Sequence, residues 1–262
     1  MKKFLLILIF ATGSLVAQIS TNPTLPTATS EVTITFDATG TPLEGYTGDV
    51  YTHTGVLTSE SEDENDWRYV IGTWGDNSSQ PKLTKSGDDL YELIITPNIL
   101  SYYGIPEEIN ITQLAFVFRS SEPNGQPQTG NLYTPVYLEG LNLTFTNPGN
   151  NSVFNLNDNI TISAEASINA DLELFVNNTS QTTAINTTTI STNYNLTSTG
   201  LHSLKAKATV GTENKETEIS VYVKTPTQTQ TMPSGVKNGI NYNPDNSVTF
   251  VLLAPEKSDV FL

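Results

Sequence analysis

The chain has 262 residues, a formal charge of −15 at pH 7 and no cysteine. The lack of cysteine excludes a disulfide framework, a thiol nucleophile and a zinc–thiolate site, so packed cores must stabilise the fold. A surface this acidic repels phosphate backbones and anionic lipids, which argues against nucleic-acid binding and favours a neutral ligand. The length suits two domains of about a hundred residues each.

Residues 1–17 have the three parts of a secretory signal peptide. Lys2 and Lys3 give the positive start, an apolar run follows over 4–10, and small residues at 15–17 precede Gln18. The apolar run is too short to cross a bilayer, so we expect no membrane span, with a short membrane anchor as the alternative. We therefore predict export by this signal peptide, to the medium or to the cell surface.

A first domain is expected over residues 31–140, after a Thr/Pro/Ser-rich segment, 18–30, that we expect to be a flexible lead. Many short stretches in this domain have the two-residue period of strands and are separated by Gly, Pro and Asn turns, which is typical of a β-sandwich. An acidic loop at 60–66 and a short helical turn at 97–103 interrupt the series. The expected strands are 31–37, 50–56, 68–74, 90–95, 113–119 and 133–138.

A second, immunoglobulin-like domain is expected over 141–224, with Thr and Ser at the polar positions of its strands. Its expected strands are 141–145, 159–164, 172–176, 188–194, 202–210 and 216–223. The polar stretch 225–238 then predicts a linker.

The last segment, 239–262, predicts the beginning of a third sandwich. A turn at 243–246 precedes an alternating strand at 248–252, and a polar turn at 256–259 leads to the start of a return strand. The return strand stops within an apolar run, which would leave its edge without a partner strand. We therefore expect the chain to be the N-terminal part of a longer protein. The sequence thus predicts an all-β protein of tandem β-sandwiches, with the first hairpin of a third at its C-terminus.

Carbohydrate binding is the chemistry that the aromatic residues allow, because rings pack on the C–H faces of sugars while amides and carboxylates bind the hydroxyls. The only tryptophans, Trp67 and Trp74, bracket one predicted strand. Strict alternation places them on opposite faces, unless Gly72 forms a bulge. We therefore expect one in the core and one exposed. Trp74 is the better candidate for the exposed one, because Asp76 and Asn77 follow it in a polar loop.

Three further features are weaker candidates. Tyr102 and Tyr103 predict a second aromatic platform, with packing over the end of the sandwich as the alternative. The acidic run 60–66 has oxygen ligands suited to calcium but lacks the EF-hand spacing, so a solvated loop is preferred. His53 lies between two threonines and is interpreted as an exposed strand residue, since a lone histidine makes no metal site. We expect no metal site and no cofactor in this chain.

Several segments resemble known families. In the first domain, WRYVIGTWGDN, PKLTKSGDDLYELIITPNI, YYGIPEEI and LAFVFRS occur in an order that resembles the N-terminal accessory domain of secreted alpha-amylase-like enzymes. Related domains occur in surface starch-binding proteins. The closing SVTFVLLAP, a charged turn and DVFL resemble the start of the sandwich before the catalytic barrel of glycoside hydrolase family 13. The segment NPGNNSVFNLNDNITISAEASINADLELFVNN resembles bacterial immunoglobulin-like spacers.

These resemblances imply the non-catalytic N-terminal part of a secreted alpha-amylase-like glycoside hydrolase, ending before its barrel. Its partners would be starch or a related α-glucan and its own downstream catalytic domain, and any calcium would belong to the parent enzyme. The two histidines and two arginines stand in none of the family's catalytic contexts, so no catalytic residue is expected here. Two alternatives stay open: a surface adhesion or structural protein of stacked sandwiches, and a standalone starch-binding protein.

Overall fold

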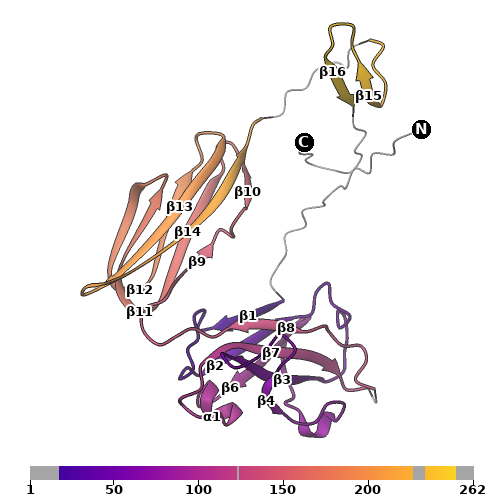
Figure 1. Cartoon of the computed structure of the whole chain (residues 1–262), viewed down its shortest axis with the longest axis vertical. Coiled ribbons are helices and arrows are strands. Elements are labelled where there is room, and N and C mark those ends of the chain that lie inside the picture. The colour runs from indigo at the N-terminus through magenta and orange to yellow at the C-terminus, as the bar shows by residue number, and fades with distance from the viewer. Residues whose placement is uncertain (1–17, 123, 227–233, 252–262) are drawn as a thin grey trace. The chain divides into compact units, whose positions relative to one another are not determined.

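The computed structural model describes residues 18–122, 124–226 and 234–251, in which almost all regular structure is β-strand (Figure 1). The chain forms two compact units, one ending at Lys224 and the other beginning at Thr225. The predicted signal peptide and the predicted return strand at 260–262 lie outside the described residues. Within the described residues, no helix is long and apolar enough to cross a bilayer.

Two four-stranded sheets form the first sandwich. Their strands alternate as the sequence predicts: Val32, Ile34 and Phe36 are fully buried, and the threonines between them are partly exposed. The first sheet has the order β1 (Ile19–Asn22), β2 (Val32–Asp37), β6 (Leu90–Ile95) and β5 (Thr84–Gly87). The second has the order β4 (Arg68–Ile71), β3 (Val50–Thr58), β7 (Ile111–Ser120) and β8 (Leu132–Pro135).

Aromatic rings fill the space between these two sheets. Phe36 stacks on Phe118 at 4.0 Å between ring centroids, and Phe118 stacks on Phe116 at 5.6 Å. Tyr91 lies 6.2 Å from Phe36, and its hydroxyl donates to the backbone oxygen of Tyr46. Two short helices, η1 (Asn77–Ser79) and α1 (Ile99–Tyr103), occupy connections between strands.

The structure corrects two sequence predictions in this domain. The segment 18–30 is not a flexible lead: β1 pairs with β2, and Leu25 is buried. Its Thr/Pro/Ser composition conceals a strand that is stabilised by its distant partner rather than by local preference. The strand predicted at 68–74 ends at Ile71, because Gly72 has a φ of +74° and turns the chain out of the sheet.

The second sandwich, from residue 141 to Lys224, has longer strands than predicted. The strands expected at 159–164 and 172–176 are one strand, β11, which pairs with β12 along almost its whole length. Its residues 163–166 also pair with β9, and 171–176 pair with β13. The strands are β9 (Leu143–Asn147), β10 (Val153–Asn155), β11 (Asn159–Val176), β12 (Thr179–Asn195), β13 (Gly200–Val210) and β14 (Glu213–Lys224).

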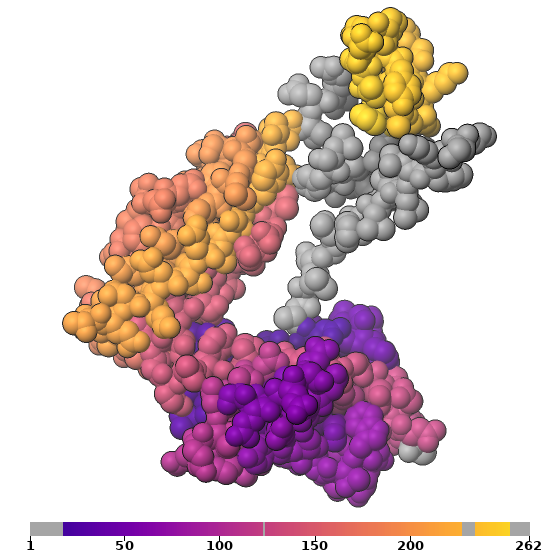
Figure 2. Space-filling model, viewed as in Figure 1, coloured from indigo at the N-terminus to yellow at the C-terminus, as the bar shows by residue number. Residues whose placement is uncertain are grey.

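The core of the second sandwich is aliphatic and rich in small residues. Five of its buried side chains are alanines, and leucine, isoleucine and valine make up the rest. In Figure 2, side chains fill the space between the strands of both sandwiches on the face that is drawn. The tandem β-sandwiches that the sequence predicts are therefore confirmed.

The second unit contains one described hairpin, of β15 (Gly239–Tyr242) and β16 (Val248–Val251). The strand predicted from residue 248 thus pairs with a segment that precedes it. Ile240 lies opposite Phe250 and Tyr242 opposite Val248, so these four exposed apolar side chains share one face of the hairpin.

Candidate functional site

Both tryptophans line one pocket of about 230 Å³ on the outer face of the second sheet of the first sandwich. Neither is in the core: Trp74 is 54% exposed and Trp67 is half-buried. The expectation that one tryptophan is a core residue is therefore wrong. His53 and Val117 are paired on β3 and β7 and form the floor. The lining residues are His53, Asn65, Trp67, Trp74, Val117 and Asn131.

Gly72 explains why the two tryptophans meet. A Cβ built on it would lie 2.3 Å from the backbone oxygen of Ser79, so only glycine allows the loop 72–80 to close this tightly. The closed loop returns Trp74 to the face that Trp67 occupies. Alternation along a continuous strand would have separated the two rings.

Trp67 is held on three sides. Its indole Nε1–H donates to the backbone oxygen of Glu64 at 3.0 Å. Its ring stacks on His53, with 5.7 Å between centroids and 19° between planes, and meets the Tyr133 ring at 77°. The Tyr133 hydroxyl also donates to the Glu64 oxygen, at 2.8 Å. The Trp67 indole N–H is thus already engaged, and only the ring is available to a ligand.

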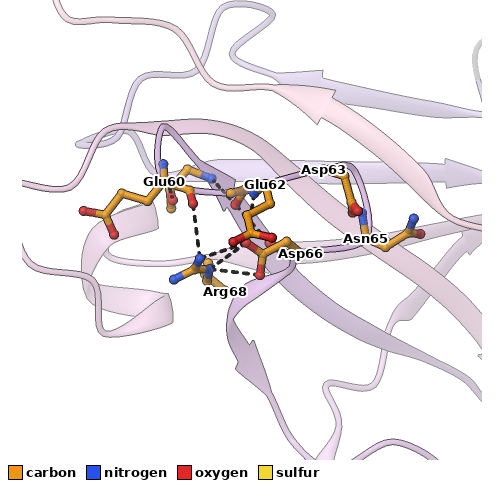
Figure 3. Close-up of polar contacts among 8 residues, drawn as sticks. Glu60, Glu62, Asp63, Asn65, Asp66 and Arg68 are labelled. Carbon is orange, nitrogen blue, oxygen red and sulfur yellow. Dashed lines mark hydrogen bonds and ion pairs between the residues drawn. The ribbon is translucent and has the colours of Figure 1, made fainter.

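The acidic run 60–66 contributes Asn65 to the pocket, and Arg68 orders the run (Figure 3). The Arg68 guanidinium donates to both carboxylate oxygens of Asp66, at 2.8 to 3.1 Å, and to the Glu60 backbone oxygen at 3.2 Å. Hydrogen bonding and charge from Arg68 lower the pKa of Asp66, and the same pair raises the pKa of Arg68. Figure 3 shows Asn65 on the far side of this loop from Arg68.

Two side-chain amides bring polar groups to the pocket. Asn131 Nδ2 donates to Asn65 Oδ1 at 3.2 Å and to the Tyr133 hydroxyl at 3.0 Å. Among the described residues, no partner takes up Asn65 Nδ2 or Asn131 Oδ1. One donor, on Asn65, and one acceptor, on Asn131, therefore remain available to hydroxyl groups of a ligand.

Trp74 is contacted by Arg119 and by His53. The Arg119 guanidinium carbon lies 4.8 Å from the Trp74 ring centroid, which is a cation–π contact. His53 meets the Trp74 ring at 87°, but is only 19° from the plane of Trp67. The planes of Trp67 and Trp74 are thus steeply inclined to each other, because the angle between them is at least the difference between 87° and 19°. They form a corner rather than a flat platform.

Arg119 is a buried cation, 2% exposed, and no ion pair joins it to a carboxylate among the described residues. Burial lowers its pKa. Its Nη1 donates to Gln80 Oε1 at 3.4 Å, and a Cβ on Gly125 would lie 2.0 Å from Nη2. The guanidinium is therefore enclosed between Trp74 and Gly125.

The other predicted site residues lie apart from the pocket lining. Asp76 caps η1 and accepts from the Ser78 N–H and hydroxyl, which lowers the pKa of Asp76. Asn77 donates to the Ser120 backbone oxygen, and its Oδ1 is buried without a partner in the described chain. Tyr103 is buried, bonded to the Thr54 hydroxyl at 2.6 Å, and Tyr102 packs beside it. The predicted Tyr102–Tyr103 platform is therefore corrected: Tyr103 belongs to the core.

A second concavity in this sandwich, of about 400 Å³, is less suited to a ligand. Lys82 pairs with Asp49 at 2.8 Å, and the Lys85 ammonium lies 5.7 Å from the Tyr91 ring centroid. Its cationic groups are thus already engaged. In the described part of the chain, no group of three or more His, Asp or Glu side chains is placed to hold a metal ion.

Comparison with known proteins adds information on the second sandwich. Residues 142–206 match the family model of the bacterial Ig domain. No curated protein matches the chain. The second sandwich thus resembles an immunoglobulin-like domain, which is a structural or binding module.

Similar solved structures come from several sources. The fibronectin(III)-like modules of Clostridium thermocellum CbhA are 20% identical over 33% of this chain and 99% of theirs, with a TM-score of 0.29. The titin domains Z1Z2 in complex with telethonin are 10% identical over 81% of this chain and 100% of theirs, with a TM-score of 0.27. Rst D1-D2 is 13% identical over 76% and 94%, with a TM-score of 0.27.

Four residues at or behind the pocket were not singled out from the sequence: Asn65, Asn131, Gln80 and Arg119. His53 was interpreted only as an exposed strand residue, although its Thr-His-Thr context correctly places it on the outer face. Asn131 and Arg119 are far from the tryptophans in the sequence, and no local pattern links them. Together these groups form a small aromatic corner with hydrogen-bonding amides, and it carries no nucleophile or acid–base pair.

Proposed function

We propose that the first sandwich is a carbohydrate-binding module that associates with starch or a related α-glucan through the Trp67–Trp74 pocket. The observation that carries the proposal is the convergence of both tryptophans on one pocket with two amides and a histidine. Rings supply an apolar stacking surface, and partly unpaired amide groups supply directional contacts to hydroxyls. The volume of about 230 Å³ is below the roughly 300 Å³ of drug-sized pockets and suits about one sugar ring.

The inclined tryptophans favour a bent polymer. A flat, extended chain such as cellulose stacks on coplanar rings, whereas the corner between Trp67 and Trp74 suits sugars whose orientation changes along the chain. The acidic run 60–66 and the charge of −15 disfavour anionic polysaccharides. A neutral, curved α-glucan meets both conditions.

We further propose that the second sandwich is a spacer and that the chain belongs to a secreted alpha-amylase-like glycoside hydrolase, whose catalytic domain lies downstream. The sequence resemblances and the predicted signal peptide at 1–17 support this proposal. The module would hold that catalytic domain near its substrate and raise its effective concentration there.

Binding to polysaccharides tests the site directly. The whole purified chain should be retained in native gels that contain starch or glycogen, and less so in gels with cellulose derivatives or alginate. Trp74→Ala should weaken retention by roughly tenfold or more, as for a buried aromatic contact at a binding site. Ile94→Ala is the matched control, because Ile94 is 56% exposed on the opposite sheet.

The outcomes separate the candidate functions. Retention by cellulose that depends on Trp74 would keep the sugar site and reject the α-glucan. No retention by any polysaccharide would favour a structural or adhesive role for the stacked sandwiches, which the bacterial Ig domain match at 142–206 also allows. Starch binding alone leaves a standalone starch-binding protein open, and the coding sequence past Leu262 would decide that point.

A further inference from the structure

The side chain of Gln80 is 6% exposed and lies behind the pocket, where its orientation is fixed by three neighbours. Arg119 carries only donors, so the Gln80 oxygen must face Arg119 Nη1, at 3.4 Å. Gln80 Nε2 then donates to the Thr73 backbone oxygen at 3.0 Å. In the reverse orientation, the Gln80 amide nitrogen would face the Arg119 donor and the Gln80 oxygen would face the Thr73 backbone oxygen, so neither hydrogen bond could form.

This orientation sets the proton position on His53. The remaining N–H of Gln80 Nε2 points at His53 Nδ1, 3.1 Å away. A donor at that place requires Nδ1 to accept, so the proton of the neutral ring lies on Nε2. Among the described residues, no group accepts from His53 Nε2. A hydrogen-bond donor is thus left free on a residue that lines the pocket.

The other histidine has the same arrangement but no free donor. His202 Nδ1 accepts from Asn177 Nδ2 at 3.1 Å, and its Nε2 donates to the Ser198 backbone oxygen at 2.9 Å. His202 is 3% exposed, and both of its ring nitrogens are satisfied. The unused Nε2–H of His53 therefore distinguishes the histidine at the pocket from His202.

We propose that Arg119 and Gln80 are positioning residues of the sugar site, which hold His53 as a neutral donor whose Nε2–H bonds a ligand hydroxyl. The proposal rests on the proposed function of the pocket. Arg119 acts twice, because it contacts the Trp74 ring and also orients Gln80. Neither Arg119 nor Gln80 lines the pocket, so both act through their neighbours.

The charges around His53 support a neutral ring. Burial lowers the pKa of His53, and the positive charge of Arg119 on β7 lowers it further. The titratable group on β8 is Tyr133, which lies against Trp67 rather than His53. In the loop 60–66, Asp66 is paired with Arg68. Protonation of His53 Nδ1 would also place two N–H donors, those of His53 and Gln80, against each other.

Gln80→Glu tests the proposal, because it keeps the size of the side chain and reverses its polarity towards His53. A carboxylate at position 80 accepts from Nδ1–H, so the neutral ring carries its proton on the wrong nitrogen. Binding of maltoheptaose to the whole chain should be roughly two- to tenfold weaker than wild type at about pH 8. Affinity should then recover as the pH falls and Nε2 becomes protonated, whereas wild-type affinity stays constant over about pH 7 to 9.

Asn177→Asp makes the same change beside His202 and is the matched control, since it should leave maltoheptaose affinity unchanged.

Nitrogen-15 NMR of the wild-type histidine rings gives a second measurement, in which the His53 signals are assigned with the His53→Gln variant. It needs neither folding of the Gln80 variant nor sugar binding. An Nε2–H tautomer at His53 supports the positioning role. An Nδ1–H tautomer, or a Gln80→Glu affinity with the wild-type pH dependence, overturns it. If the wild type binds no sugar, the proposed function fails, and the tautomer still decides whether Arg119 and Gln80 fix the ring.

Discussion

The two sandwiches are both built of paired β-strands but differ in where they place aromatic rings. The first fills its core with Phe36, Tyr91, Phe116 and Phe118 and still has Trp67 and Trp74 on its outer face. The second has no aromatic ring among its fully buried core residues and shows Thr, Ser and Asn along β12. Rings bring specific contacts as well as buried area, whereas small aliphatic residues bring only close packing. The proposed binding role of the first sandwich and the proposed spacer role of the second rest on this difference.

The largest expected losses of unfolding free energy come from core substitutions, which test whether the two sandwiches have separate cores. Phe118→Ala removes a ring that stacks on both Phe36 and Phe116, so it should lower the unfolding free energy of the first sandwich by about 3–5 kcal/mol. Leu174→Ala should lower that of the second by about 2–5 kcal/mol. Denaturant unfolding, followed by tryptophan fluorescence for the first sandwich and circular dichroism for both, measures these changes. A loss of fluorescence-detected stability in Leu174→Ala would contradict two separate cores.

A smaller loss of stability is expected from a substitution at Gly72, in the loop that brings Trp74 to the pocket. Gly72→Ala places a Cβ against the Ser79 backbone oxygen and should destabilise the first sandwich by roughly 1–3 kcal/mol, with a shift in tryptophan emission. Gly40→Ala is the control: Gly40 also has a positive φ, of +73°, but its Cβ would meet nothing within 4 Å. Equal losses in the two variants would mean that backbone strain alone, and not the close approach to Ser79, explains the glycine.

The smallest expected effect is the pH dependence of stability that the burial of His53 causes. Because the pKa of His53 is lowered by burial and then by Arg119, the unfolded chain takes up the proton first as the pH falls below about 6.5. The stability of the first sandwich is therefore complete above that pH, declines as the pH falls through it, and levels off below the pKa of the folded state. Denaturant midpoints of wild type and His53→Gln between about pH 5 and 8 check this. Parallel curves would rule out His53 as the source.

The sequence predicted those parts of the fold that local alternation controls. Val32, Ile34 and Phe36 in β2, and Leu114, Phe116 and Phe118 in β7, alternate with less apolar residues, and their strands were expected. β1 was missed because its threonine and asparagine have no clear period, and its pairing with β2 stabilises it. Of the site, Trp67 and Trp74 were expected on opposite faces of a strand, and their meeting in one pocket depends on Gly72.

The rest of the pocket could not be predicted, because it depends on contacts between distant segments. Asn131 reaches Asn65 across 66 positions of the chain, and Arg119 reaches Gln80 across 39. Neither contact leaves a periodic signal in the sequence. For Tyr103 the sequence suggested an exposed ring, because its neighbours in the chain are polar. The ring lies in the core instead, where the Thr54 hydroxyl forms a hydrogen bond with the Tyr103 hydroxyl.

The β11–β12 hairpin has a consequence for how the second sandwich opens. One continuous hairpin pairs with β9 near its first half and with β13 near its second, so both of these strands are attached to it. Separation of the hairpin therefore breaks the pairing of β9 and of β13 together. The domain is expected to exchange its core amide hydrogens in a single cooperative opening.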